Sequence, residues 1–104
     1  MKVICVDFDG VCHKYSKGYH DGTCYDIPVD GAFDAIVKLQ NKGYKVVVLT
    51  ARQPLSEIED WFEKHWPGEY GAWPEVTNTK PVAIAYIDDR GIRFTNWVDV
   101  LNYF

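Results

Sequence analysis

The sequence of 104 residues has no long hydrophobic run and no excess of basic residues. No stretch approaches the roughly 18 consecutive apolar residues that span a bilayer, so we expect no membrane partner. The formal net charge of −4 argues against non-specific binding to nucleic acid, because phosphate backbones attract basic surfaces. The charge therefore does not indicate nucleic acid as a partner, although nucleic acid stays open as one.

Cysteine is also scarce, with three residues, an odd number for a disulfide framework. Met1-Lys2 leads directly into an apolar run that the acidic Asp7 interrupts, which is unlike a secretory signal peptide. Free thiols in a reducing cytoplasm are the simplest interpretation. A disulfide, if one formed, would have to involve Cys12 and Cys24.

The first half of the chain alternates apolar runs with a helical period. Residues 3–6 and 44–49 are nearly continuous apolar runs, typical of parallel strands buried on both faces. The segment between them has apolar residues at helical spacing, with Asp30 as the expected N-cap and Gly43 at the expected C-cap. A strand, a helix and a strand with short joints predict a right-handed crossover in a parallel sheet.

The second half continues this alternation. The predicted elements are a helix whose first position is Pro54, strands near 74–77 and 82–87, and a closing helix over 96–104 with Trp97, Val100 and Leu101 pointing inward. The length fits one domain over residues 1–104 with a single core. We therefore expect an α/β, Rossmann-like, three-layer fold with a central, mainly parallel sheet.

Three of the apolar runs each end in a polar cluster. The clusters are Asp7-Phe8-Asp9-Gly10, Thr50-Ala51-Arg52 and Asp88-Asp89-Arg90. Because ligands of open α/β sheets bind beyond the carboxyl ends of the strands, all three clusters should meet at one edge. If the chain stayed extended, Asp7 and Asp9 would point to the same face.

The clusters would crowd up to four carboxylates into one place, which requires a cation. A hard ion with oxygen ligands fits, and Mg²⁺ is the common choice beside phosphate. Gly10 permits a positive φ and a close approach of the backbone to an anion. Lys80 and Arg52 are nearby cations that could hold a phosphate.

Four short segments of the chain resemble the motifs of the haloacid dehalogenase-like superfamily. Asp7-Phe8-Asp9-Gly10-Val11 resembles the first motif, Leu49-Thr50 the second, Lys80 the third and Ile87-Asp88-Asp89 the fourth. A single Asp-x-Asp is common in proteins and would not indicate a family. Four motifs in the expected order, which together cover nearly the whole chain, are a much more specific signal.

The resemblance implies a Mg²⁺-dependent phosphomonoesterase. Asp7 would attack phosphorus and form an aspartyl-phosphate, and Asp9 would protonate the leaving oxygen and then accept a proton from water. The implied phosphate-binding residues are Gly10, Thr50, Arg52 and Lys80. The implied metal-binding residues are Asp7, Asp9 through its backbone carbonyl, and Asp88, with Asp89 contacting a metal-bound water or replacing Asp88.

Most members of this superfamily insert a cap domain, but the gap at 12–28 holds only a flap. The resemblance therefore implies a small capless phosphatase with an open site. A second subunit in a homo-oligomer, or a phosphorylated macromolecule, would then cover it, and the substrate could also be a small phosphorylated molecule. Two alternatives stay open: a nucleotidase or nucleic-acid 3′-end phosphatase, and a non-catalytic phosphate-binding module.

Other residues have two interpretations each. The flap residues Tyr15, Tyr19, His20 and Tyr25 either stack on a base or sugar ring or pack the loop down. Arg52 either holds phosphate or pairs with an acid, and Thr50 could also cap a helix. The Cys12, His13, His20 and Cys24 spacing matches no compact zinc pattern.

Overall fold

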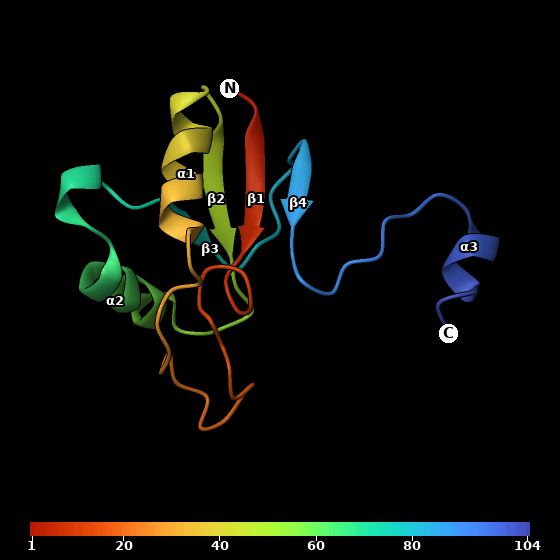
Figure 1. Ribbon diagram of the computed structural model, residues 1–104, viewed down its shortest axis with the longest axis horizontal. Helices are drawn as coiled ribbons and strands as arrows, with labels where there is room; N and C mark the ends of the chain where they lie inside the picture. Colours follow the sequence, from red (N-terminus) through yellow and green to blue (C-terminus); the bar gives the residue numbers. More distant parts are fainter.

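The computed structural model describes all residues 1–104 and contains a four-stranded, all-parallel sheet (Figure 1). The strands lie in the order β3-β2-β1-β4 and are β1 (Val3–Asp7), β2 (Lys45–Leu49), β3 (Glu75–Thr77) and β4 (Ala85–Ile87). The helices are α1 (Ala32–Asn41), α2 (Leu55–His65), α3 (Trp97–Leu101) and the short 3₁₀-helix η1 (Gly68–Tyr70). The α/β class and the parallel sheet are confirmed, and the arrangement is compatible with a Rossmann-like fold.

The strand register aligns the carboxyl ends of the sheet. Asp7 lies opposite Leu49, which in turn lies opposite Thr77. On the other side of β1, Val6 pairs with Ile87. The segments that follow all the strands therefore leave the sheet at one edge, as the pattern predicted.

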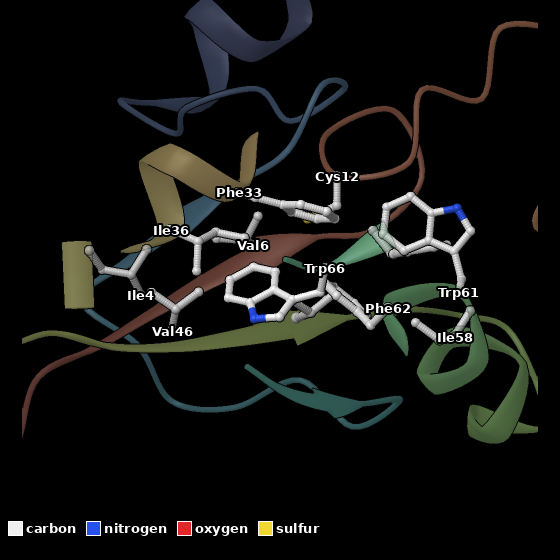
Figure 2. Close-up of a cluster of buried hydrophobic side chains, with 12 residues drawn as sticks. Ile4, Val6, Cys12, Phe33, Ile36, Val46, Ile58, Trp61, Phe62 and Trp66 are labelled. Atoms are coloured by element: carbon white, nitrogen blue, oxygen red, sulfur yellow. The ribbon is translucent and has the colours of Figure 1, made fainter. Parts of the chain in front are cut away.

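Helices α1 and α2 pack against the same face of the sheet (Figure 2). One buried cluster joins Ile4, Val6, Val46 and Val48 of the strands to Phe33, Ile36, Ile58, Trp61, Phe62 and Trp66 of the two helices. The crossovers from β1 to β2 and from β2 to β3 step in the same direction along the sheet. Right-handed crossovers then place both helices on one side.

The opposite face of the sheet has no covering helix, so the expected three layers are two. Helix α3 follows an extended segment and lies away from the sheet (Figure 1). Trp97 and Leu101 were expected to point inward but are 69% and 66% exposed, and Val100 is only half-buried. The prediction was wrong because periodicity identifies the apolar side of a helix but not the surface that covers it.

Helix and strand ends also differ from the expectation. Asp30 is not a cap, because Gly31 holds that position at φ 80° and no side chain caps α1. Pro54 precedes α2 as its N-cap, and β4 pairs over only three residues of the apolar run at 82–87. Lys42 is the C-cap of α1, one position before the expected Gly43, which follows it at φ 94°. Among the helices, none has the length and apolar character needed to cross a membrane.

The core assignment is testable by truncating one side chain in the cluster and one outside it. Phe62→Ala should lower the free energy of unfolding by about 3–5 kcal/mol, because Phe62 is fully buried. Trp97→Ala is the control, with an expected change within about 0.5 kcal/mol. Denaturant titration measures both, and an equal loss in the two variants would show that α3 packs on the body.

Candidate functional site

A cavity of about 400 Å³ opens at the carboxyl edge of the sheet. Asp7, at the end of β1, lines it together with Asp88, Asp89 and Arg90, which follow β4. Lys80, from the connection between β3 and β4, completes its charged lining. The structure thus brings together Asp7, Lys80, Asp88 and Asp89 of three motifs. Of the second motif, Leu49 lines the cavity but Thr50 does not.

Asp7 lies on the sheet face opposite α1 and α2, because strand side chains alternate and Ile4 and Val6 take the helical side. Its Oδ1 accepts the Phe8 N–H at 3.1 Å. Burial raises the pKa of Asp7, the Phe8 hydrogen bond opposes the rise, and the negative charges of Asp88 and Asp89 add to it. The net effect is a raised pKa, so a cation beside Asp7 would favour its charged form.

The cavity has more acidic than basic side chains. Lys80 and Arg90 face three carboxylates, and the Lys80 ammonium also lies 4.4 Å from the centre of the Tyr86 ring. A phosphate group would add further negative charge to this lining. Phosphate binding therefore needs an additional cation.

Asp88 and Asp89 are held in different ways. Asp88 Oδ1 accepts the backbone N–H groups of Arg90, at 3.0 Å, and Gly91. Asp89 lies against Gly10, where any Cβ would overlap its carboxylate. Gly10 has φ 84°, and its N–H donates to the His13 carbonyl oxygen at 2.8 Å. Glycine is thus needed to admit Asp89, and its N–H does not face an anion.

The donors around this cavity suit Mg²⁺ in kind, because carboxylate oxygens are hard ligands. Their arrangement is looser than a formed metal site: no three His, Cys, Asp or Glu side chains are grouped as metal ligands. Asp7, Asp88 and Asp89 line the cavity, whereas the Asp9 side chain turns elsewhere. The magnesium site therefore stays a prediction based on the type of ligand.

Asp9 does not share a face with Asp7, because the chain stops being extended after β1. The N–H groups of Cys12 and His13 both donate to the Phe8 carbonyl oxygen at 2.9 Å, which closes a tight turn. The Asp9 carboxylate instead accepts hydrogen bonds from Arg52 Nε at 3.0 Å and from Arg52 Nη2 at 3.1 Å. Burial would raise the pKa of Asp9, but hydrogen bonds from His13 and Arg52 and the Arg52 charge lower it.

His13 is a site residue that the sequence did not reveal in this role. It is fully buried, and its Nδ1 lies 2.8 Å from Asp9 Oδ1. Its Nε2 accepts the Asp26 N–H at 3.0 Å, so Nε2 carries no proton and Nδ1–H donates to Asp9. The only sequence signal was a histidine four residues after Asp9 in a polar loop.

Arg52 pairs with an acid, which was one of its two interpretations. In addition to Asp9, it donates from Nη1 to the Gly22 carbonyl oxygen at 2.6 Å, and its guanidinium lies 5.7 Å from the Tyr15 ring centre. Thr50 is buried and does not cap α2. Its Oγ1 accepts the Arg52 N–H at 3.0 Å. Arg52 thus joins the flap to the edge of the sheet.

The aromatic side chains of the flap pack mainly on one another. Tyr15 stacks on Tyr25 with ring centres 6.4 Å apart, and His20 meets Tyr25 edge-on at 5.3 Å. Tyr19 remains 73% exposed. Burial raises the pKa of the Cys12 thiol to about 12, and contacts with Asp9 and Asp26 engage both ring nitrogens of His13.

Comparison of the chain with protein-family models, with curated proteins and with solved structures finds no match. The resemblance to the haloacid dehalogenase-like superfamily therefore rests on the four motifs and their order. Their position at the edge of a parallel sheet is the structural observation that accompanies it.

The Arg52 ion pair makes a prediction about the titration of Asp9. In wild-type protein the pKa of Asp9 should lie below its ordinary value, because the charged form is held by His13 and Arg52. Arg52→Gln removes the cation, so the pKa should rise. Carbon-13 NMR of the carboxyl group measures it, with Lys45→Gln as a control that removes a distant positive charge. An unchanged pKa in Arg52→Gln would contradict the ion pair.

Proposed function

We propose that the chain is a Mg²⁺-dependent phosphomonoesterase of the haloacid dehalogenase-like type, with a Rossmann-like fold and a cytoplasmic location. One observation carries the proposal: Asp7, Lys80, Asp88 and Asp89 line a single cavity although they come from opposite ends of the chain. A covalent mechanism on phosphate needs this combination of a nucleophile, a cation and metal ligands.

The first step forms an aspartyl-phosphate. An Asp7 carboxylate oxygen bonds to phosphorus while the bond from phosphorus to the leaving oxygen breaks, and that oxygen takes a proton from Asp9. Water then attacks the phosphorus, Asp9 accepts its proton, and the Asp7 carboxylate and inorganic phosphate are released. Lys80 neutralises charge on the phosphoryl oxygens throughout both steps.

Mg²⁺, when bound, neutralises the phosphate and the crowded carboxylates, and Asp7, Asp88, Asp89 and the Asp9 carbonyl oxygen would hold it. Asp9 has the right charge state to accept a proton from water, since its carboxylate is ion-paired. To donate a proton, Asp9 must be held less tightly by Arg52 and its side chain must turn toward the cavity that Asp7 lines, which it does not line in this structure. A phosphate dianion nearby favours this change, because it attracts the guanidinium and raises the proton affinity of Asp9.

The cavity at Asp7 is open, and no residue of the flap lines it, so small phosphorylated molecules and exposed phosphates on macromolecules are both candidate substrates. A second subunit could complete the cover. The nucleotidase or 3′-end phosphatase and the non-catalytic binding module are the alternatives, and a substrate panel that includes nucleotides and 3′-phosphorylated oligonucleotides separates them.

The nucleophile is tested by a change that preserves shape. Asp7→Asn should reduce turnover of an aryl phosphate by about 10³-fold or more, because an amide cannot form the acyl phosphate. Activity should also require Mg²⁺ and be lost with a chelator. Asp34→Asn, an exposed acid on α1, is the matched control and should retain wild-type activity. Wild-type turnover by Asp7→Asn would overturn the proposal.

A further inference from the structure

A second cavity, of about 660 Å³, adjoins the Asp7 cavity along the edge strand β4 (Figure 1). This β4 cavity is lined by residues 84–86, by Asp88 and by residues 91–93. Tyr86, Asp88 and Gly91 line both cavities, so the two share a boundary. The volume of the β4 cavity is within the range of small-molecule sites.

The strand register places both cavities on the same face of the sheet. Cys5 pairs with Tyr86, and Asp7, two residues after Cys5, takes the same side of β1. The Ile84 N–H donates to the Val3 carbonyl oxygen at 2.8 Å, which extends the pairing, so Ile84 shares this face with Tyr86. Because neighbouring strands lie about 4.8 Å apart, a ligand at Asp7 crosses one strand to enter the β4 cavity.

Tyr86 contributes its ring rather than its hydroxyl to the shared boundary. The hydroxyl donates to the Pro81 carbonyl oxygen at 2.6 Å and accepts the Ala83 N–H at 3.1 Å. The Lys80 ammonium, which lines the Asp7 cavity, lies 4.4 Å from the centre of the Tyr86 ring. A phosphate held by Lys80 would therefore lie beside an apolar ring that also lines the β4 cavity.

The rest of the shared boundary is a turn that carries no bulky side chain. Asp88 Oδ1 accepts the backbone N–H groups of Arg90 and Gly91. A Cβ at Gly91 would lie only 2.7 Å from Asp88 Oδ1, so this turn requires glycine. Gly91 therefore adds no side chain to the boundary between the two cavities.

The lining of the β4 cavity is mainly apolar. Residues 84–86 and Ile92 supply apolar groups, and Asp88 and Arg93 are the charged members. Ile84 and Ile92 are exposed to solvent, so a ligand can reach them. An alkyl or aryl group placed there would remove apolar surface from water, which is favourable in proportion to the area covered.

We infer that the β4 cavity binds the leaving group and that the substrates are phosphate monoesters of apolar alcohols. The inference rests on the proposed function, since it takes the phosphate to lie between Asp7 and Lys80. The ester then extends over the Tyr86 ring, and Ile84 and Ile92 set the preference for an apolar chain. Esters of sugars and nucleosides have polar leaving groups that gain little from these side chains.

The test compares ethyl phosphate with hexyl phosphate, whose leaving alcohols are of similar acidity and differ in apolar length. With Mg²⁺, wild-type kcat/KM should be at least about tenfold higher for hexyl phosphate, which requires only partial burial of the added methylene groups. A hexyl phosphate that ends in a carboxylate tests whether Arg93 selects a charge instead. Its kcat/KM should be lower than that of hexyl phosphate.

Variants of exposed isoleucines separate the cavity from a general effect of chain length. Ile84→Asn and Ile92→Asn should each lower the ratio of hexyl to ethyl kcat/KM about threefold or more, because an amide replaces an apolar side chain of the cavity. Ile27→Asn is the matched control. Ile27 is 54% exposed, close to the 57% of Ile84, and lines neither cavity, so its ratio should equal that of wild type.

The outcomes distinguish this inference from the proposed function. Equal kcat/KM for ethyl and hexyl phosphate, a ratio that both cavity variants leave unchanged, or a preference for the carboxylate ester would overturn the inference, while phosphatase activity stands. No hydrolysis of these or other monoesters would overturn the proposed function and the inference with it.

Discussion

The parallel pairing of β1 with a neighbour on each side is the constraint on which the site depends. Because β2 and β4 both run parallel to β1, the segments that follow all three strands leave the sheet at one edge. Asp7 meets Asp88 and Asp89 for this reason. The alternation of side chains along β1 then sends Asp7 away from the buried helical face. A nucleophile buried under α1 and α2 would be closed to substrate.

A second feature, the Arg52–Asp9 ion pair, joins the flap to this edge. Arg52 contacts the flap at Gly22 and at the Tyr15 ring while it holds Asp9. His13 reaches Asp9 from the flap side. In the proposed mechanism, the proton-transfer residue Asp9 thus belongs to one network with the flap, whereas the nucleophile Asp7 belongs to the sheet.

Sequence patterns predicted the parts of the fold that follow a period. Apolar runs located β1, β2 and β4, and the ends of β1 and β4 located Asp7 and the later acids. The Arg52–Asp9 and His13–Asp9 contacts depend on the turn after Phe8, which no periodicity encodes. The predicted packing of α3 was also wrong, because an apolar helix face does not specify which surface of the protein it packs against.

The central claim, a covalent intermediate on Asp7, is tested most directly by trapping it. Protein mixed with an aryl phosphate and Mg²⁺ is quenched in acid, digested, and analysed by mass spectrometry. We expect a phosphoryl group on the peptide that contains Asp7, converted by borohydride to homoserine at that position. Turnover without any such adduct, or an adduct on another residue, would contradict the account.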